Sequence, residues 1–221
     1  MTKIKICGLF RECDIDYVNE TCPDYIGFIL NFPKSHRNVT PETAKNLKSR
    51  LSPDISAVGV FVNQEIEYVI DAARTIGLDV IQLHGTEDNE YIKKLRERID
   101  GAITGNKHSG SGNIQIWKAF KIQASEDLEN ARKCIADEVL LDNGYGTGKA
   151  FDWSIAGGFD REFCLAGGLN PDNVAEAIKQ LKPKLVDISS GVETDKVKDK
   201  EKILKAVKAV KAVKTVKTVR G

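Results

Sequence analysis

The sequence predicts an α/β protein with a single (β/α)8 TIM barrel, in which eight parallel strands alternate with helices. Eight short apolar runs alternate with segments of helical periodicity along the 221 residues, a length typical of one such barrel. A doubly wound open sheet is the other candidate, but no glycine fingerprint for a dinucleotide follows the first strand. We therefore expect residues 1–221 to form one barrel domain.

Four apolar runs predict strands in the first half of the chain, with helices between them. Thr40 followed by Pro41 is typical of a helix start, because threonine caps the first turn and proline fits its first position. Asn63 can cap the next helix, whose apolar positions repeat at helical spacing. The expected strands are 3–7, 24–30, 55–62 and 79–84, and the expected helices lie at about 11–20 and after Thr40, Asn63 and Thr86.

Four further apolar runs predict the second half of the barrel. Between its last two strands, Asn170 can cap a helix and Pro171 fits the first turn of that helix. The expected strands are 114–120, 138–142, 163–166 and 185–189, with a helix around 128–135. The last helix is expected to face the barrel with Ile203, Leu204, Val207 and Val210.

Three segments depart from this regular alternation. Residues 100–113 are rich in glycine and serine, so we expect a loop insertion on the face opposite the catalytic end. Residues 143–154 (NGYGTGKAFDWS) predict a mobile glycine-rich loop. Residues 211–221 belong to a lysine-valine repeat of three residues, which drifts by about 60° per repeat around a helix. We expect a frayed basic tail there; binding of an acidic partner is the alternative.

Composition excludes several classes of function. The net charge of +1 gives no bulk attraction to nucleic acid or membrane. No apolar run approaches the roughly 20 residues of a membrane span, and the N-terminus lacks the apolar core of a signal peptide. The five cysteines are scattered, without a CxxC pair or a zinc pattern, so we expect reduced thiols, no metal and a cytoplasmic location.

Two turns with glycines and hydroxyls follow the last two strands. Gly167 and Gly168 end one strand, and Ser190 and Gly191 follow the other. Glycines let backbone N–H groups approach an anion, and a helix N-terminus after the second turn would add its dipole. In (β/α)8 barrels this place often holds phosphate. The alternative is that these are ordinary turn glycines.

Polar side chains also stand at the carboxyl ends of strands, where burial predicts apolar residues. Cys7 ends the first strand, and Lys5 shares its face, so a cation would lower the pKa of the thiol and favour the thiolate. Asp142 ends the sixth strand and is either a capping group or a general acid whose pKa is raised by burial. An inert buried thiol remains the alternative for Cys7.

Three further residues are candidates for binding. Arg37 follows the second strand, and a guanidinium suits bidentate capture of a carboxylate, although it can also be a surface charge. Asp187 either makes a structural hydrogen bond or contacts a substrate hydroxyl. We interpret His84 as a supporting residue and not a base. Lys149 lacks the spacing of a nucleotide-binding P-loop.

Seven blocks of the sequence, in order, resemble those of the phosphoribosylanthranilate isomerase family of tryptophan biosynthesis, which has a (β/α)8 fold. They run from Lys3 to about Val210. The blocks are KICGL, GFILNFPKSHRNV, VGVFVN, IQLHG, LLDN with GTGKAFDW, LAGGLNPDNV and VDISSGVE. His36 stands where the family often has proline, and neither the 100–113 segment nor the tail resembles the family.

The resemblance implies a role for each matching residue. Cys7 is implied as general base and Asp142 as general acid. Arg37 is implied to hold the anthranilate carboxylate, and Asp187 to lie near the sugar hydroxyls. The two turns are implied to bind phosphate through Gly167, Gly168, Ser190 and Gly191.

The implied reaction is an Amadori rearrangement of a small phosphorylated substrate without a cofactor, in a monomer or homodimer. The sugar isomerase of histidine biosynthesis is an alternative, although an aspartate would be expected there in place of Cys7. Indole-glycerol phosphate synthase, with a lysine acid and a longer chain, is another. A phosphate-binding barrel without catalysis is the alternative that is not an enzyme.

Overall fold

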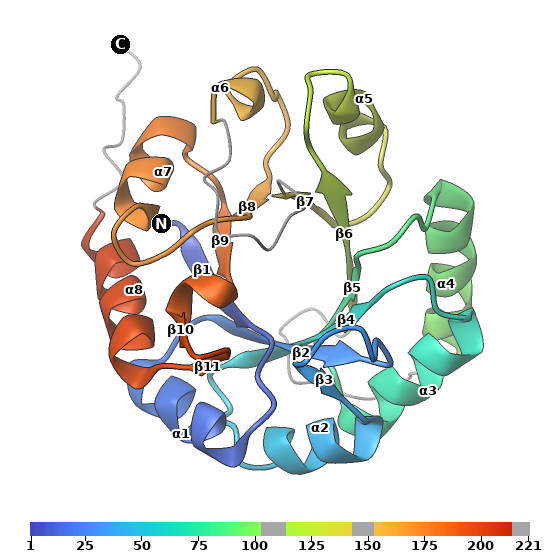
Figure 1. The fold of residues 1–221 in the computed structure, drawn as a ribbon. Coiled ribbons are helices and arrows are strands. Elements are labelled where there is room, and N and C mark those ends of the chain that lie inside the picture. The colour runs from blue at the N-terminus through green and yellow to red at the C-terminus, as the bar shows by residue number, and fades with distance from the viewer. Residues whose placement is uncertain (103–113, 143–152, 214–221) are drawn as a thin grey trace.

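Eight parallel strands close into a barrel, and helices surround it on the outside (Figure 1). The computed structural model describes residues 1–102, 114–142 and 153–213. Neighbouring strands pair in the order β1-β9-β8-β7-β6-β5-β4-β2, and pairing of β1 with β2 closes the ring. The barrel strands are β1 Lys3–Cys7, β2 Tyr25–Leu30, β4 Ser56–Phe61, β5 Val80–Leu83, β6 Gln115–Lys121, β7 Glu138–Asp142, β8 Cys164–Ala166 and β9 Leu185–Ile188. The predicted (β/α)8 fold is therefore confirmed.

Eight helices alternate with these strands in the described parts of the chain. They are α1 Glu12–Thr21, α2 Pro41–Lys48, α3 Ile66–Ile76, α4 Asn89–Ala102, α5 Asp127–Arg132, α6 Trp153–Ala156, α7 Val174–Leu181 and α8 Lys200–Ala212. None of these described helices is both long enough and apolar enough to cross a membrane. The sequence did not predict four shorter elements, which are β3 Asn38–Val39, the 3-10 helix η1 Ser190–Val192, β10 Glu193–Thr194 and β11 Val197–Lys198.

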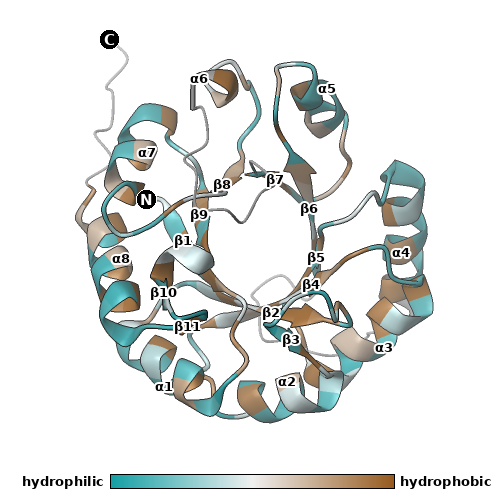
Figure 2. Cartoon of the chain, in the orientation of Figure 1, coloured by the Kyte–Doolittle hydropathy of each residue, from teal (hydrophilic) through white to brown (hydrophobic). Residues whose placement is uncertain are grey.

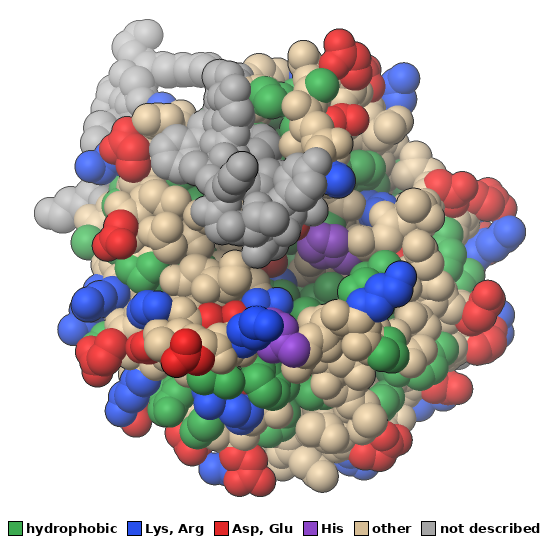
Figure 3. All heavy atoms as spheres, in the orientation of Figure 1, with side chains coloured by type: hydrophobic (Ala, Val, Ile, Leu, Met, Phe, Trp, Pro, Cys, Tyr) green, Lys and Arg blue, Asp and Glu red, His purple; other side chains and the backbone are tan. Residues whose placement is uncertain are grey.

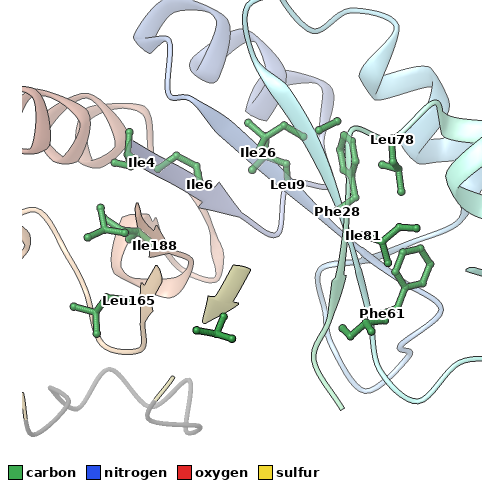
Figure 4. Close-up of a cluster of buried hydrophobic side chains, with 14 of the residues drawn as sticks. Ile4, Ile6, Leu9, Ile26, Phe28, Phe61, Leu78, Ile81, Leu165 and Ile188 are labelled. Carbon is green, nitrogen blue, oxygen red and sulfur yellow. The ribbon is translucent and has the colours of Figure 1, made fainter. Parts of the chain in front are cut away.

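The core has two layers because successive side chains of a strand point to opposite faces. The outer layer joins strand residues to helix residues, and Figure 4 shows Ile4, Ile6 and Phe28 within it. The inner layer consists of strand residues and so fills the barrel. Its members are Val58, Val80, Trp117, Ala119, Leu140, Cys164, Ala166 and Leu185. Figure 2 shows largely hydrophobic strands in the barrel and helices that carry both hydrophilic and hydrophobic residues.

The hydrogen bonds at the helix starts test the predicted caps. The side chain of Thr40 accepts a hydrogen bond from the backbone N–H of Thr43, and α2 begins at Pro41 as predicted. Asn63 does not cap α3, because its Oδ1 accepts from the N–H of Thr86 at 2.7 Å. The Oδ1 of Asn170 accepts from the backbone N–H groups of Asp172 and Asn173, which is the hydrogen bonding predicted for a cap. The backbone N–H of Val174, where α7 begins, donates to the carbonyl of Asn170 at 3.1 Å.

The departing segments lie partly outside the described residues. Helix α4 runs to Ala102, so the predicted loop of 100–113 begins inside its last turn, and 103–113 are not described. Residues 143–152 are not described, and the last two residues of the predicted glycine-rich loop begin α6. Helix α8 runs to Ala212, and 214–221 are not described. Of its four predicted inward residues, Ile203, Val207 and Val210 are buried and Leu204 is half-buried.

Candidate active site

Cys7 lies at the carboxyl end of β1 with its side chain inside the barrel. The neighbouring strand places Gly27 directly opposite Cys7. A Cβ on Gly27 would lie 2.8 Å from Cys7 Sγ and 3.3 Å from Lys5 Nζ. The glycine therefore leaves the space that the thiol and the ammonium group share, and it allows Lys5 and Cys7 to interact as strand alternation predicts.

Lys5 forms a buried ion pair with Asp187 of β9. Lys5 Nζ lies 2.7 Å from Asp187 Oδ2, and the two side chains are 0% and 7% exposed. The other carboxylate oxygen, Asp187 Oδ1, is buried and has no hydrogen-bond partner among the described residues. Burial alone would lower the pKa of Lys5, but Asp187 and Cys7 together raise it. One oxygen of Asp187 is thus structural, and the other is available to a hydroxyl donor.

Burial decides the ionisation of the Cys7 thiol. The desolvation of the thiol raises its pKa above the ordinary value of 9.0, and the negative charge of Asp187 adds to this. Lys5 acts in the predicted direction and lowers the pKa, but it does not outweigh burial. The predicted effect of the cation is present, but the net pKa of the thiol is raised because desolvation, with a smaller contribution from Asp187, outweighs Lys5.

Asp142 lies at the end of β7 and contacts His84, which follows β5. His84 Nε2 is 3.3 Å from Asp142 Oδ2, and Gln82 Nε2 is 3.1 Å from His84 Nδ1. Gln82 and Asp142 thus contact the two ring nitrogens of His84. The supporting role of His84 remains a prediction.

Arg37 lies over the turn that follows Cys7. A Cβ on Gly8, which has a φ of +80°, would lie 2.4 Å from Arg37 Cδ. The guanidinium makes two hydrogen bonds of 2.6 Å to the carboxylate of Glu193. Glu193 and its second partner Lys198 were not predicted from the sequence, because both lie in a polar stretch that resembles a solvated surface.

The two predicted phosphate turns are in direct contact. Gly167 and Gly168 have φ angles of +89° and +67°, in the left-handed region that favours glycine. A Cβ on Gly191 would lie 1.9 Å from the carbonyl oxygen of Leu169, so only glycine allows the second turn to approach the first. Ser190 begins the three-residue η1, which is shorter than the helix expected after this turn.

Gly191→Ala is expected to lower the free energy of unfolding by about 1–3 kcal/mol, because the added methyl group overlaps backbone atoms that cannot rotate away. It is also expected to weaken phosphate binding, since the two turns must separate. Urea denaturation and inhibition by inorganic phosphate measure these two effects. Gly158→Ala is the matched control, because a Cβ there meets nothing within 4 Å. Equal stability of the two variants would contradict the close contact.

All of these groups lie at one mouth of the barrel, because parallel strands end on the same side. Direct contacts join Arg37 and the phosphate turn to the end of β1. Ser189 Oγ donates to the Cys7 carbonyl at 3.1 Å, and Arg37 packs on Gly8. Asp142 ends a strand three places from β1 in the barrel order. Figure 3 shows histidine side chains next to Lys or Arg side chains near the centre of one face. Among the described residues, no group of three His, Cys, Asp or Glu side chains could hold a metal ion.

The closed barrel, with ionisable side chains at the carboxyl ends of its strands, has the arrangement that is typical of (β/α)8-barrel enzymes. Residues 4–209 match the model of the family N-(5'phosphoribosyl)anthranilate (PRA) isomerase. A PRA isomerase of Acetivibrio thermocellus is 46% identical over 212 residues, which cover 92% of this chain and 93% of the relative. The chain belongs to the N-(5'-phosphoribosyl)anthranilate isomerase family.

Solved structures agree with this assignment. A PRA isomerase from Thermotoga maritima superimposes with a TM-score of 0.81 at 36% identity, over 96% of this chain and 99% of that chain. A second PRA isomerase structure, in complex with reduced 1-(o-carboxyphenylamino)-1-deoxyribulose 5-phosphate, has a TM-score of 0.78 at 35% identity, with coverage of 96% and 99%.

Proposed function

We propose that this chain isomerises N-(5'-phosphoribosyl)anthranilate in tryptophan biosynthesis. The reaction is an Amadori rearrangement of an aminoaldose to 1-(2-carboxyphenylamino)-1-deoxyribulose 5-phosphate. Family membership supports this assignment. The observation that carries it is that Arg37 and the Ser189–Gly191 turn both touch the end of β1, at Gly8 and Cys7. A cation for one end of the substrate and a phosphate turn for the other thus flank the thiol.

The mechanism needs one acid and one base. Asp142 protonates the ribose ring oxygen, and the ring opens to a protonated imine. The Cys7 thiolate then removes the proton from sugar C2, and the electron pair moves into the imine to give an enolamine. Tautomerisation of the enolamine yields the ketone. The imine accepts the electron pair within the substrate, so electrons balance without an external oxidant or reductant.

Binding residues hold the two ends of the substrate around this chemistry. Arg37 binds the anthranilate carboxylate, and the turns of Gly167, Gly168, Ser190 and Gly191 bind the phosphate through backbone N–H groups. The unpartnered Oδ1 of Asp187 accepts from a sugar hydroxyl. Such positioning of a substrate at both ends contributes to the rate by holding the reacting atoms in line.

The ligand class, the oligomeric state and the cellular location are supported less directly than the reaction. The relative solved with a reduced ribulose 5-phosphate product analogue supports a small phosphorylated ligand for this chain. A Thermotoga maritima relative is described as dimeric, which supports the homodimer among the two predicted states. We also propose a cytoplasmic location, on the basis of the scattered thiols.

The decay of anthranilate fluorescence with freshly generated phosphoribosylanthranilate tests this function. Enzyme-dependent decay is expected with the wild type, and Cys7→Ser is expected to abolish it. Absence of decay with the wild type would overturn the proposal. Turnover of the histidine-pathway substrate would then favour that isomerase, and binding of the product analogue without turnover would favour a non-catalytic barrel.

A further inference from the structure

The guanidinium of Arg37 is held from one side only. Arg37 Nε donates to Glu193 Oε1 and Nη2 donates to Glu193 Oε2, both at 2.6 Å. An arginine side chain has five N–H groups, and this fork uses two of them. The described residues contribute no hydrogen bond to Nη1, so the edge formed by Nη1 and the second N–H of Nη2 remains available for a second planar anion.

Glu193 is itself fixed by a buried lysine. Lys198 Nζ lies 2.6 Å from Glu193 Oε1 and donates to the carbonyl of Ser189 at 2.9 Å. The side chain of Lys198 is 0% exposed. Glu193 and Lys198 face each other across the β10–β11 pair, and Lys202 Nζ donates to the carbonyl of Glu193 at 2.7 Å. The carboxylate is therefore anchored on the segment that directly follows the phosphate turn.

The charges of this cluster favour a further anion. Burial by itself raises the pKa of Glu193, but Arg37 and Lys198 lower it to about 2, so the carboxylate is ionised at neutral pH. With both cations protonated, Arg37, Lys198 and Glu193 together carry one net positive charge. Glu193 thus orients the guanidinium without cancelling the attraction of the cluster for a carboxylate.

We infer that Glu193 is a positioning residue for substrate recognition: it aims the free edge of Arg37 at the substrate carboxylate and, through Lys198, fixes that edge relative to the phosphate turn. The inference rests on the proposed function and deepens it, because it explains how the protein selects a substrate by the distance between its carboxylate and its phosphate. Removing the fork would let the flexible arginine side chain turn away, while the phosphate turn would stay in place.

Glu193→Gln tests this inference, because the substitution keeps the size of the side chain and removes its charge. We expect KM for phosphoribosylanthranilate to rise about tenfold, the effect of one charge-assisted hydrogen bond, with kcat nearly unchanged. Inhibition by anthranilate is expected to weaken equally, and inhibition by inorganic phosphate to stay as in the wild type. Glu97→Gln, at an exposed position of α4, is the matched control.

A double-mutant cycle separates positioning from a merely structural role. In an Arg37→Ala background, Glu193→Gln is expected to add nothing to the rise in KM. If the unpaired Lys198 destabilises the fold, Glu193→Gln combined with Lys198→Gln removes the buried cation, keeps a donor on the side of the Ser189 carbonyl and is expected to give the same selective loss. Additive losses, or an equal loss of phosphate inhibition, would overturn the inference. Calorimetric titration with anthranilate and phosphate gives the same comparison without turnover, and undetectable anthranilate binding by the wild type would also overturn it.

Discussion

Cys7→Ala is expected to lower kcat by about 10²–10⁴-fold, the usual contribution of a positioned acid or base. KM is expected to change little, because the residues proposed to bind the carboxylate and the phosphate remain. Steady-state fluorescence kinetics measure both constants. Cys134→Ala is the matched control, since that thiol is also 7% exposed but lies outside the barrel mouth. Near wild-type turnover of Cys7→Ala would remove the thiol from the mechanism.

The pH profile gives an independent readout of the same base. The pKa of the Cys7 thiol is raised by burial and Asp187 and lowered by Lys5 and Lys198, with a net result above 9.0. Only the thiolate is a base, so kcat/KM of the wild type is expected to rise with pH across the neutral range. Cys7→Ala is expected to lose this rising limb. Asp142→Asn is expected to retain it while losing a similar factor in kcat.

Lys5→Met is expected to lower the free energy of unfolding by about 3–5 kcal/mol, because it leaves the buried carboxylate of Asp187 without its partner. Lys5 is fully buried, and its ion pair of 2.7 Å is shielded from solvent. Denaturation in urea measures the loss. Lys3→Met is the matched control on the same face of β1, and as an exposed position it is expected to change stability by less than about 0.5 kcal/mol.

The double variant Lys5→Met with Asp187→Asn decides whether the loss comes from the unpaired charge. It is expected to recover much of the stability, because no isolated charge remains in the interior. The raised pKa of Lys5 also determines how the stability contributed by the ion pair depends on pH. Since the pKa of Lys5 is raised above 10.5, the pair stabilises the protein fully below that pH, and its contribution is lost only as the solution becomes more alkaline than the raised pKa. A double variant as unstable as Lys5→Met would contradict this account.

Periodicity in the sequence determined the barrel, because burying one face of each strand and helix forces a regular apolar pattern. The bounds predicted for β1 and β7 agree with the structure, and so does the start of α2 at Thr40 and Pro41. The cap predicted from Asn170 has the expected hydrogen bonds, because the N–H groups that donate to it lie within the same local turn. The cap predicted from Asn63 was wrong because the fold brings the N–H of Thr86, from a distant part of the chain, to its side chain.

Polar exceptions at strand ends likewise point to the candidate site from the chain alone, since an apolar strand that ends in Cys7 or Asp142 has no packing reason to do so. Glu193 and Lys198 carry no such signal, because their importance depends on a hairpin that brings them against Arg37. The net pKa of Cys7 was also decided by tertiary structure. Strand alternation places Lys5 beside the thiol, but only the closed barrel sets how much water is excluded and pairs that cation with Asp187. Local pattern follows from the order of residues, whereas burial and charge pairing depend on which distant residues the fold brings together.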